Sequence, residues 1–156
     1  MSILTSLRAS ASALTAQRMR MNAIANNVAN VETTRTPEGG PYRRQQVVFT
    51  PRAGGMPFLQ LVRAGLGNVG GRAPDWIGGS GGVQVAQVIE DQAPGRLVHQ
   101  PDHPDANADG YVEYPNVDLV TEMVDMLSAT RSYEANVTVL SSAKSMAMRA
   151  LDIMKA

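Results

Sequence analysis

Residues 116–156 read NVDLVTEMVDMLSATRSYEANVTVLSSAKSMAMRALDIMKA, and the predicted fold is built around this segment. It holds no Gly and no Pro, and its apolar residues recur at alternating steps of three and four. That spacing predicts one long helix with a narrow apolar stripe, which is typical of a helix that pairs with another. The stripe is broken only at Thr130 and Lys144. Its members are Leu119, Met123, Met126, Tyr133, Val137, Leu140, Ala147, Leu151 and Met154.

A stripe of this length requires a second long helix beside it. At ~1.5 Å per residue the predicted helix is roughly 55–60 Å long, which exceeds the width of a small domain. The N-terminal segment supplies the candidate partner, because Leu7, Leu14, Met21 and Val28 are spaced by seven residues. The two ends of the chain are therefore expected to pair.

Gly and Pro divide the chain into helical ends and a non-helical middle. All 14 Gly lie between Gly39 and Gly110, and all nine Pro lie between Pro37 and Pro115. Both residues are disfavoured inside helices. The predicted segments are an N-terminal helix with an Asn-rich turn (1–36), a Pro/Gly-rich β and loop segment (37–115) with an insertion at 53–81, and a C-terminal helix (116–156). The predicted fold is mainly α, with paired heptad helices forming a coiled-coil-like layer and a small β-rich insert between them.

Two polar residues are predicted to begin the helices. Ser2 is a suitable N-cap for the first helix, which should end between Asn27 and Thr36, before Pro37. Asn116 follows Pro115 and is predicted to cap the second helix. Asp118 then places negative charge in its first turn, where the helix dipole favours it.

The middle segment contains four strand candidates. Residues 83–90 form the clearest one, with Val83, Val85 and Ile89 on one face. Ala93-Pro94-Gly95 then predicts a turn from which residues 96–99 return antiparallel. Residues 46–49 and 111–114 are the other two candidates.

Composition excludes several classes of protein. The 156 residues include no Cys, so disulfides and thiolate metal sites are absent. The formal net charge of zero gives no general attraction to nucleic acid. No run of 18 apolar residues is present, and the first thirty residues lack the continuous apolar core of a secretory signal peptide. With two His and no converging pocket residues, the chain is interpreted as a non-enzyme without a small-molecule substrate, cofactor or catalytic residue.

Three local patterns resemble ligand sites, and each is better explained otherwise. Gly65-Leu66-Gly67-Asn68-Val69-Gly70 matches the dinucleotide fingerprint, but Gly71-Arg72-Ala73-Pro74 follows where a helix should begin. Asp105, Asn107, Asp109 and Gly110 have the spacing of a calcium loop, but its twelfth position is Asn116 rather than Glu. His99, Asp102, His103 and Asp105 are interrupted by prolines and are interpreted as a solvated loop. No metal site is predicted.

An asparagine cluster near residue 26 is the one feature that these interpretations do not cover. Asn22, Asn26 and Asn30 recur at steps of four, and Asn27 lies beside them. Each Asn in a helix interior costs roughly half a kcal/mol relative to Ala. Two explanations stay open: a frayed helix end, or amides that bond to a neighbouring chain or to the segment returning after Asn30.

At these residues the chain resembles the bacterial flagellar axial proteins of the rod and hook. The resemblance covers nearly the whole chain except about residues 53–81, and within the family it is to the proximal-rod members. Seven motifs carry it: Ala25-Asn26-Asn27-Val28-Ala29-Asn30, Thr33-Thr34, residues 36–43, Gly110-Tyr111-Val112, Tyr114-Pro115-Asn116-Val117, Ser132-Tyr133-Glu134-Ala135-Asn136 and Ser145-Met146.

The resemblance implies a structural subunit of the proximal rod, in which the terminal helices form an inner layer of an axial tube that transmits motor torque. The implied partners are other rod proteins, further copies of the chain, the inner-membrane ring with its rod-base adaptor, and the flagellar export apparatus. The implied location is the periplasmic rod of the basal body, reached by type III export without a cleaved signal peptide. The alternatives are another rod or hook component, or a generic coiled-coil adaptor. The expected assembly positions are Leu7, Leu14, Met21, Asn22, Asn26, Asn27, Asn30, Met126, Tyr133, Asn136, Val137 and Leu140.

Overall fold

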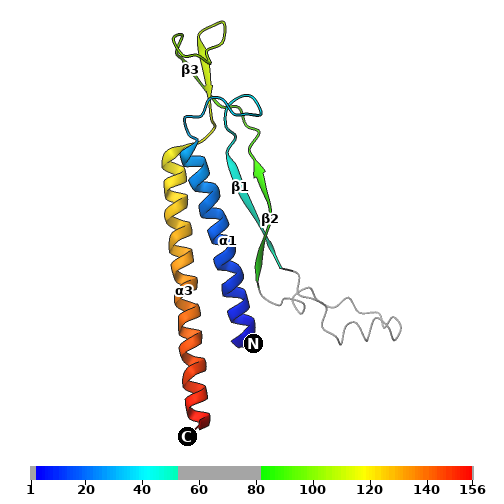
Figure 1. Cartoon of the computed structure of the whole chain (residues 1–156), viewed down its shortest axis with the longest axis vertical. Helices are drawn as coiled ribbons and strands as arrows, with labels where there is room; N and C mark the ends of the chain where they lie inside the picture. Colours follow the sequence, from blue (N-terminus) through cyan, green and yellow to red (C-terminus); the bar gives the residue numbers. More distant parts are fainter. Residues whose placement is uncertain (1–2, 53–81, 156) are drawn as a thin grey trace, which may run out of the picture. The chain divides into compact units, whose positions relative to one another are not determined.

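A computed structural model describes residues 3–52 and 82–155 (Figure 1). The predicted Ser2 cap, the insertion at 53–81 and the glycine pattern at 65–70 lie outside the described residues. The chain divides into two compact units, which are described separately. Of the described residues, one comprises 3–16, 49–52, 82–84 and 135–155, and the other comprises 17–48 and 85–134. The second unit contains the ion pairs Arg20–Asp125 and Arg44–Glu122.

Helix α1 spans Ile3–Ala29, and its end falls within the predicted range. Asn30 closes this end, because its amide nitrogen Nδ2 donates to the carbonyl of Asn26 at 2.9 Å. Its side-chain oxygen accepts the hydroxyl of Thr33 at 3.1 Å. Asn30 therefore serves the turn that follows the helix.

Helix α3 spans Leu119–Lys155, so the predicted long C-terminal helix is confirmed, but its predicted cap is wrong. Asp118 caps it, accepting the backbone N–H of Val120 at 3.0 Å and the hydroxyl of Thr121 at 2.9 Å. These two bonds, the Thr121 bond first, hold the pKa of the Asp118 carboxyl below its ordinary value of 3.8. Asn116 instead accepts the backbone N–H of Arg44 at 3.2 Å, which is why it is not free to cap the helix.

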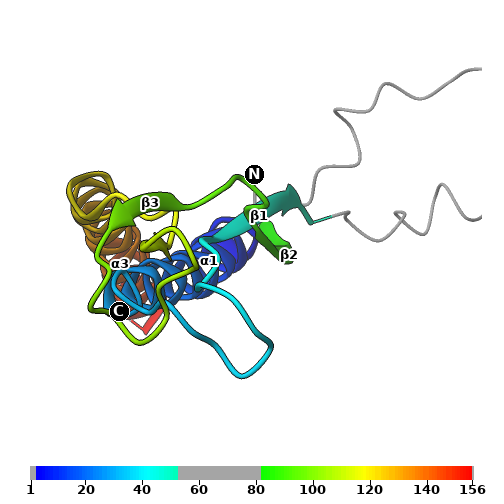
Figure 2. The ribbon, with the colours of Figure 1, turned by 90° about the horizontal axis from the view of Figure 1, so that it is seen from above.

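The four strands form two separate two-stranded sheets. Strand β1 (Gln45–Pro51) pairs with β2 (Val83–Glu90), and the two lie side by side in both views (Figure 1, Figure 2). Their backbone bonds join Asp91 to Arg44 at one end and Arg52 to Gly82 at the other, so they run antiparallel. All four predicted strands are thus present, with β1 longer than predicted.

The predicted pairing of residues 83–90 with 96–99 is wrong. Strand β3 (Arg96–His99) pairs antiparallel with β4 (Tyr111–Tyr114), with Arg96 opposite Tyr114 and His99 opposite Tyr111. The eight-residue β2 finds a partner of similar length in the seven-residue β1, whereas β3 offers only four residues. Only glycine fits at position 95, just before β3, because a Cβ there would lie 2.0 Å from the carbonyl oxygen of Tyr114.

The loop between β3 and β4 uses the oxygens that the calcium pattern would require. Asp105 accepts the hydroxyl of Thr34 at 2.8 Å and faces Arg35 at 3.7 Å. Asn107 accepts the backbone N–H groups of Asp109 and Tyr111. Gly110 takes a φ of 77°, which favours glycine at this turn. These oxygens therefore have roles in the fold.

The side chains protected within the chain are mostly small. In the first unit Ala16 and Ala143 are buried, and Ser12 joins α1 to β2 by accepting the backbone N–H of Val83 at 3.0 Å. The second unit has its core at Ala23, Ile24, Val112 and Ala129, together with two buried polar residues described below. Among the described residues no helix is long and apolar enough to cross a membrane.

The stripe of α3 that the chain itself protects differs from the predicted seam by one residue at every second position. Met126, Tyr133, Leu140 and Ala147 belong to both stripes and are half-buried. Between them the protected residues are Glu122, Ala129, Asn136 and Ala143, which are small or polar. The larger Leu119, Met123, Val137 and Leu151 of the predicted seam are instead 42–60% exposed. A helix can pack more closely on alanine than on leucine, so the small side chains face inward.

Candidate functional site

Asn27 of α1 is the centre of a buried polar cluster in the second unit. Its side chain is 1% exposed. Its amide Nδ2 donates to the carbonyl of Gln45 at 2.9 Å, and its Oδ1 accepts the backbone N–H of the same residue at 2.8 Å. The hydroxyl of Tyr42 also donates to Oδ1 at 3.0 Å. Asn27 therefore bonds to the segment that returns after the helix, as one of the two open explanations of the asparagine cluster proposed.

Glu122 of α3 faces Asn27 and is also 1% exposed. Its Oε2 accepts Nδ2 of Asn27 at 3.1 Å, and its Oε1 accepts Nε of Arg44 at 2.6 Å. A buried carboxylate requires such partners, since an unpaired charge is costly to remove from water. One carboxylate thus connects α3 to α1 and to the residue before β1.

Two further charges complete the cluster. Arg20 donates to Asp125 at 3.0 Å, and Arg44 approaches the same carboxylate at 3.8 Å. Burial, followed by the nearby Glu90 and Glu122 carboxylates, raises the pKa of Tyr42 above its ordinary value of 10.0. The two arginines balance the two carboxylates. We call this set the polar junction; its members are Arg20, Asn27, Tyr42, Arg44, Glu122 and Asp125.

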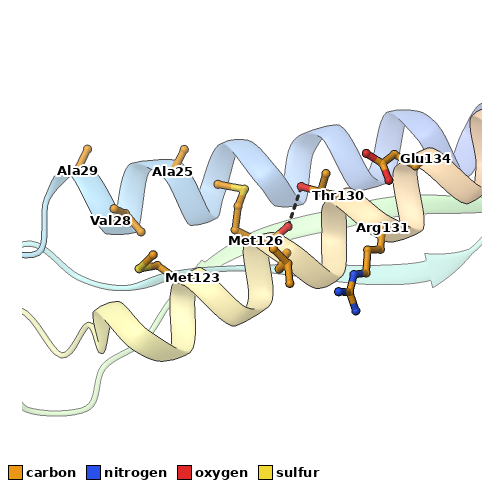
Figure 3. Close-up of a pocket in the computed structure, with 9 residues that line it drawn as sticks. Ala25, Val28, Ala29, Met123, Met126, Thr130, Arg131 and Glu134 are labelled. Atoms are coloured by element: carbon orange, nitrogen blue, oxygen red, sulfur yellow. Dashed lines mark hydrogen bonds between the residues drawn. The ribbon is translucent and has the colours of Figure 1, made fainter.

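An apolar groove lies between α1 and α3 in the same unit. Its volume is about 650 Å³. Val28 from α1 and Met123 from α3 point toward one another across it (Figure 3). Thr130 donates to the carbonyl of Met126 at 2.8 Å and to the sulfur of Met21 at 3.8 Å. The lining residues are Ala25, Val28, Ala29, Met123, Met126, Leu127, Thr130, Arg131 and Glu134.

The first turns of α3 also present large apolar side chains to solvent. Val120 is 70% exposed, Val124 is 64% exposed and Leu127 is 57% exposed. Leu119 and Met123 add to them. Apolar residues gathered on one element are typical of surfaces that contact another protein. We call these five residues the exposed α3 face.

The structure separates the predicted assembly residues into three groups. Asn27 is buried and faces its own chain. Asn22 and Asn26 are exposed, and Val137 is 42% exposed. The remaining ones are half-buried, namely Leu7, Leu14, Met21, Asn30, Met126, Tyr133, Asn136 and Leu140. Only Met126 of the predicted set lines the groove.

The sequence prediction missed the charged members of the junction. Arg44 and Glu122 come from segments that no motif connects, because 77 residues separate them, from Gln45 to Thr121. One signal was available. Glu122 precedes Met126 by four residues and Ala129 by seven, so it continues an otherwise small or apolar stripe. A carboxylate in that position indicates a buried partner.

The described residues include no group of three or more His, Asp or Glu side chains arranged to hold a metal ion. The contacts observed within the site are hydrogen bonds, ion pairs and apolar contacts. Such a site can hold helices together and offer a surface to another protein.

Two protein-family models match this sequence. Residues 7–35 match the one described as flagella basal body rod protein. Residues 108–153 match the one described as flagellar basal body rod FlgEFG protein, C-terminal. The two matches cover most of α1 and most of α3, the helices that contribute to the junction and the groove.

Curated proteins are similar over nearly the whole chain. A flagellar basal-body rod protein FlgC of Borreliella burgdorferi is 46% identical over 99% of this chain and 99% of its own length. The protein of that name from Bacillus subtilis is 46% identical over 96% of this chain and 97% of its own. The one from Escherichia coli O6:H1 is 44% identical over 98% of each.

Proposed function

The chain belongs to the family of flagellar basal-body rod proteins named FlgC, and from this membership we propose its place in the flagellum. It is a structural subunit of the rod. We infer that it occupies the proximal rod, where copies of the chain assemble with other rod proteins into the axial tube that transmits torque for motility.

The observation that carries the mode of assembly is the exposed α3 face. In a free subunit the exposed side chains of Val120, Val124 and Leu127 contribute no hydrophobic stabilisation, whereas a neighbouring helix would bury them. Burial of one such side chain contributes roughly 1.5–3 kcal/mol. The groove beside this face supplies a concave apolar surface between α1 and α3. We propose that neighbouring subunits pack against this face and this groove.

The predicted assembly residues remain part of the proposal, with altered roles. Asn22, Asn26 and Val137 are exposed and suited to contact a neighbour directly. Asn27 acts from inside by holding the helix end. The half-buried members pack within their own chain, and their exposed atoms are available to contact a neighbouring subunit.

The remaining partners and the location follow from family membership. We propose that the rod-base adaptor and the inner-membrane ring hold the first subunits in the periplasm. The flagellar export apparatus delivers the chain without removal of a signal peptide. The relatives are named as rod proteins, and we infer that this chain likewise has no catalytic activity.

Complementation of a deletion strain of the source bacterium tests the proposal. Leu127→Asp places a charge on the exposed α3 face, and Ser128→Asp places the same charge on the neighbouring exposed residue. We expect the Leu127 variant to be exported but to leave cells non-motile and without rods in electron micrographs of basal bodies. The Ser128 variant should restore motility.

Two results would contradict the proposal. Motile cells carrying Leu127→Asp would exclude the exposed α3 face as an assembly surface. A deletion strain that still builds complete basal bodies would exclude the rod function itself.

A further inference from the structure

The inward face of α1 repeats alanine at intervals that leave its alignment with α3 weakly specified. On α1, Ala9, Ala16 and Ala23 are spaced by seven residues, and the last two are buried. On α3, Ala129 and Ala143 are buried and are spaced by fourteen. A slide of α1 by seven residues would place Ala16 where Ala23 was, so the alanines of α1 do not distinguish the two alignments. Such a stripe holds helices close but does not select one alignment.

In the second unit the two helices run antiparallel with a defined register. Asn27 bonds to Glu122, and Met21 lies 3.8 Å from the hydroxyl of Thr130. Met21 precedes Asn27 in α1, whereas its contact Thr130 follows Glu122 in α3, so the two helices run in opposite directions. Something other than the alanines must therefore select this alignment.

The polar junction contains side chains that, unlike the alanines of α1, do not recur at a seven-residue interval along the helix. Asn27 and Glu122 are both 1% exposed, and the bond between them forms only in the observed alignment. A slide of one heptad would separate Glu122 from Asn27 and leave the buried carboxylate incompletely paired. A single buried polar contact between helices is known to select register at some cost in stability.

We propose that the Asn27–Arg44–Glu122 cluster is a register lock between α1 and α3. Arg44 lies just before β1, and the backbone of the next residue is bonded to Asn27. The lock is therefore complete only when the chain has returned from α1 to the start of β1. The Glu122 carboxylate therefore couples the alignment of α1 with α3 to the position of the chain at the start of β1. This inference concerns the free subunit and does not depend on the rod function.

The absence of Cys from the chain allows the alignment to be measured in the purified full-length protein. The pair Met21→Cys and Thr130→Cys reports the observed register. The pairs Met21→Cys with Met123→Cys and Val28→Cys with Thr130→Cys report slides of one heptad in opposite directions. Seven helical residues correspond to roughly 10 Å, and a disulfide requires Cα atoms within about 7 Å, so the pairs are distinguishable.

The test variant replaces both members of the ion pair, Arg44→Met with Glu122→Leu, so that no buried charge is left alone. Asp125 keeps Arg20 in this variant, and Asn27 keeps Gln45 and Tyr42. The matched control is Arg43→Met, which removes a neighbouring arginine whose guanidinium donates to the exposed carbonyl of Ala93.

With Arg44 and Glu122 present, and in the Arg43→Met control, oxidation should cross-link only the Met21–Thr130 pair. The double variant should keep its helical circular dichroism but also cross-link at least one slipped pair. Cross-linking confined to Met21–Thr130 in the double variant would overturn the lock. Loss of helicity in the double variant would overturn it too, because the lock is argued to select alignment and the apolar pair can replace its stability.

Discussion

At the scale of single residues, the asparagines near the end of α1 have different roles, although Asn26 and Asn27 are adjacent. Asn22 and Asn26 are exposed, while Asn27 is 1% exposed and bonds to Tyr42, Gln45 and Glu122. Asn suits this position because its amide is both donor and acceptor and can match the N–H and the C=O of one backbone residue. A carboxylate in its place would face Glu122 and could not donate to it.

Asn27→Ala should therefore be strongly destabilising. It leaves the backbone groups of Gln45 and one oxygen of Glu122 without their partner. Buried groups left unsatisfied cost about 1–3 kcal/mol each, so we expect a loss of about 2–4 kcal/mol in the free energy of unfolding. Denaturant unfolding of the purified protein measures it. Asn26→Ala is the matched control and should change the free energy by less than about 0.5 kcal/mol. Equal effects of the two substitutions would show that Asn27 has no special role.

At the scale of elements, α3 has two faces with opposite characters. The face turned to its own chain carries Glu122, Ala129 and Ala143, and the face turned to solvent carries Val120, Val124 and Leu127. An amphipathic helix in a lone subunit would show the reverse, with its large apolar residues inside. The arrangement fits a helix that packs within its own chain through small residues and whose larger apolar residues would be buried by another subunit.

Ala129→Leu tests the inner face. Ala129 is 0% exposed, so three additional carbon atoms must displace α1 or the groove lining. Overpacking of this kind costs typically about 1–3 kcal/mol, and the melting temperature of the free subunit should fall accordingly. Ser128→Leu introduces the same side chain at the neighbouring exposed position and should leave the melting temperature nearly unchanged. A melting temperature of Ala129→Leu equal to that of the unsubstituted subunit would mean that the two helices do not pack closely there.

At the scale of the whole molecule, the chain between the two helices is organised by its two small sheets. The β1–β2 sheet is closed at the far end by the backbone bond from Arg52 to Gly82 at 2.9 Å. These two residues therefore already have the spacing of a hairpin, and the strands do not need a long connection. The β3–β4 sheet is joined instead by the loop that Asn107 and Gly110 shape.

Replacing residues 54–81 with a short Gly-Ser linker should preserve the fold. Hairpin loops of about three to five residues are common, and the shorter loop lowers the entropic cost of closure by roughly 1–2 kcal/mol. We expect the melting temperature of the subunit to be unchanged or slightly higher, and complemented deletion cells to remain motile. A variant that folds and is exported but builds no rod would show that residues 54–81 belong to an assembly contact.

The sequence alone determined the elements. Gly and Pro confined to the middle of the chain set the two helices, since neither residue is tolerated inside them. Alternation and turn residues located β2 at 83–90 and β4 at 111–114. The motifs around Asn26 and Tyr133 indicated the family. These features are local, so neighbouring residues suffice to predict them.

Which helix faces and which strands meet depends on packing between segments far apart in the chain. The apolar heptad pattern marks the stripe through Met123 and Val137, whereas the protected stripe carries Glu122 and Asn136, and this outcome depends on the small side chains that α1 can approach. The partner of β2 depended on strand length, because residues 45–51 and 96–99 were both available. The bond from Arg44 to Glu122 joins segments far apart in the chain, and no periodic pattern encodes it. Long-range pairing of charges is a property of the packed molecule, because only burial makes one specific partner necessary.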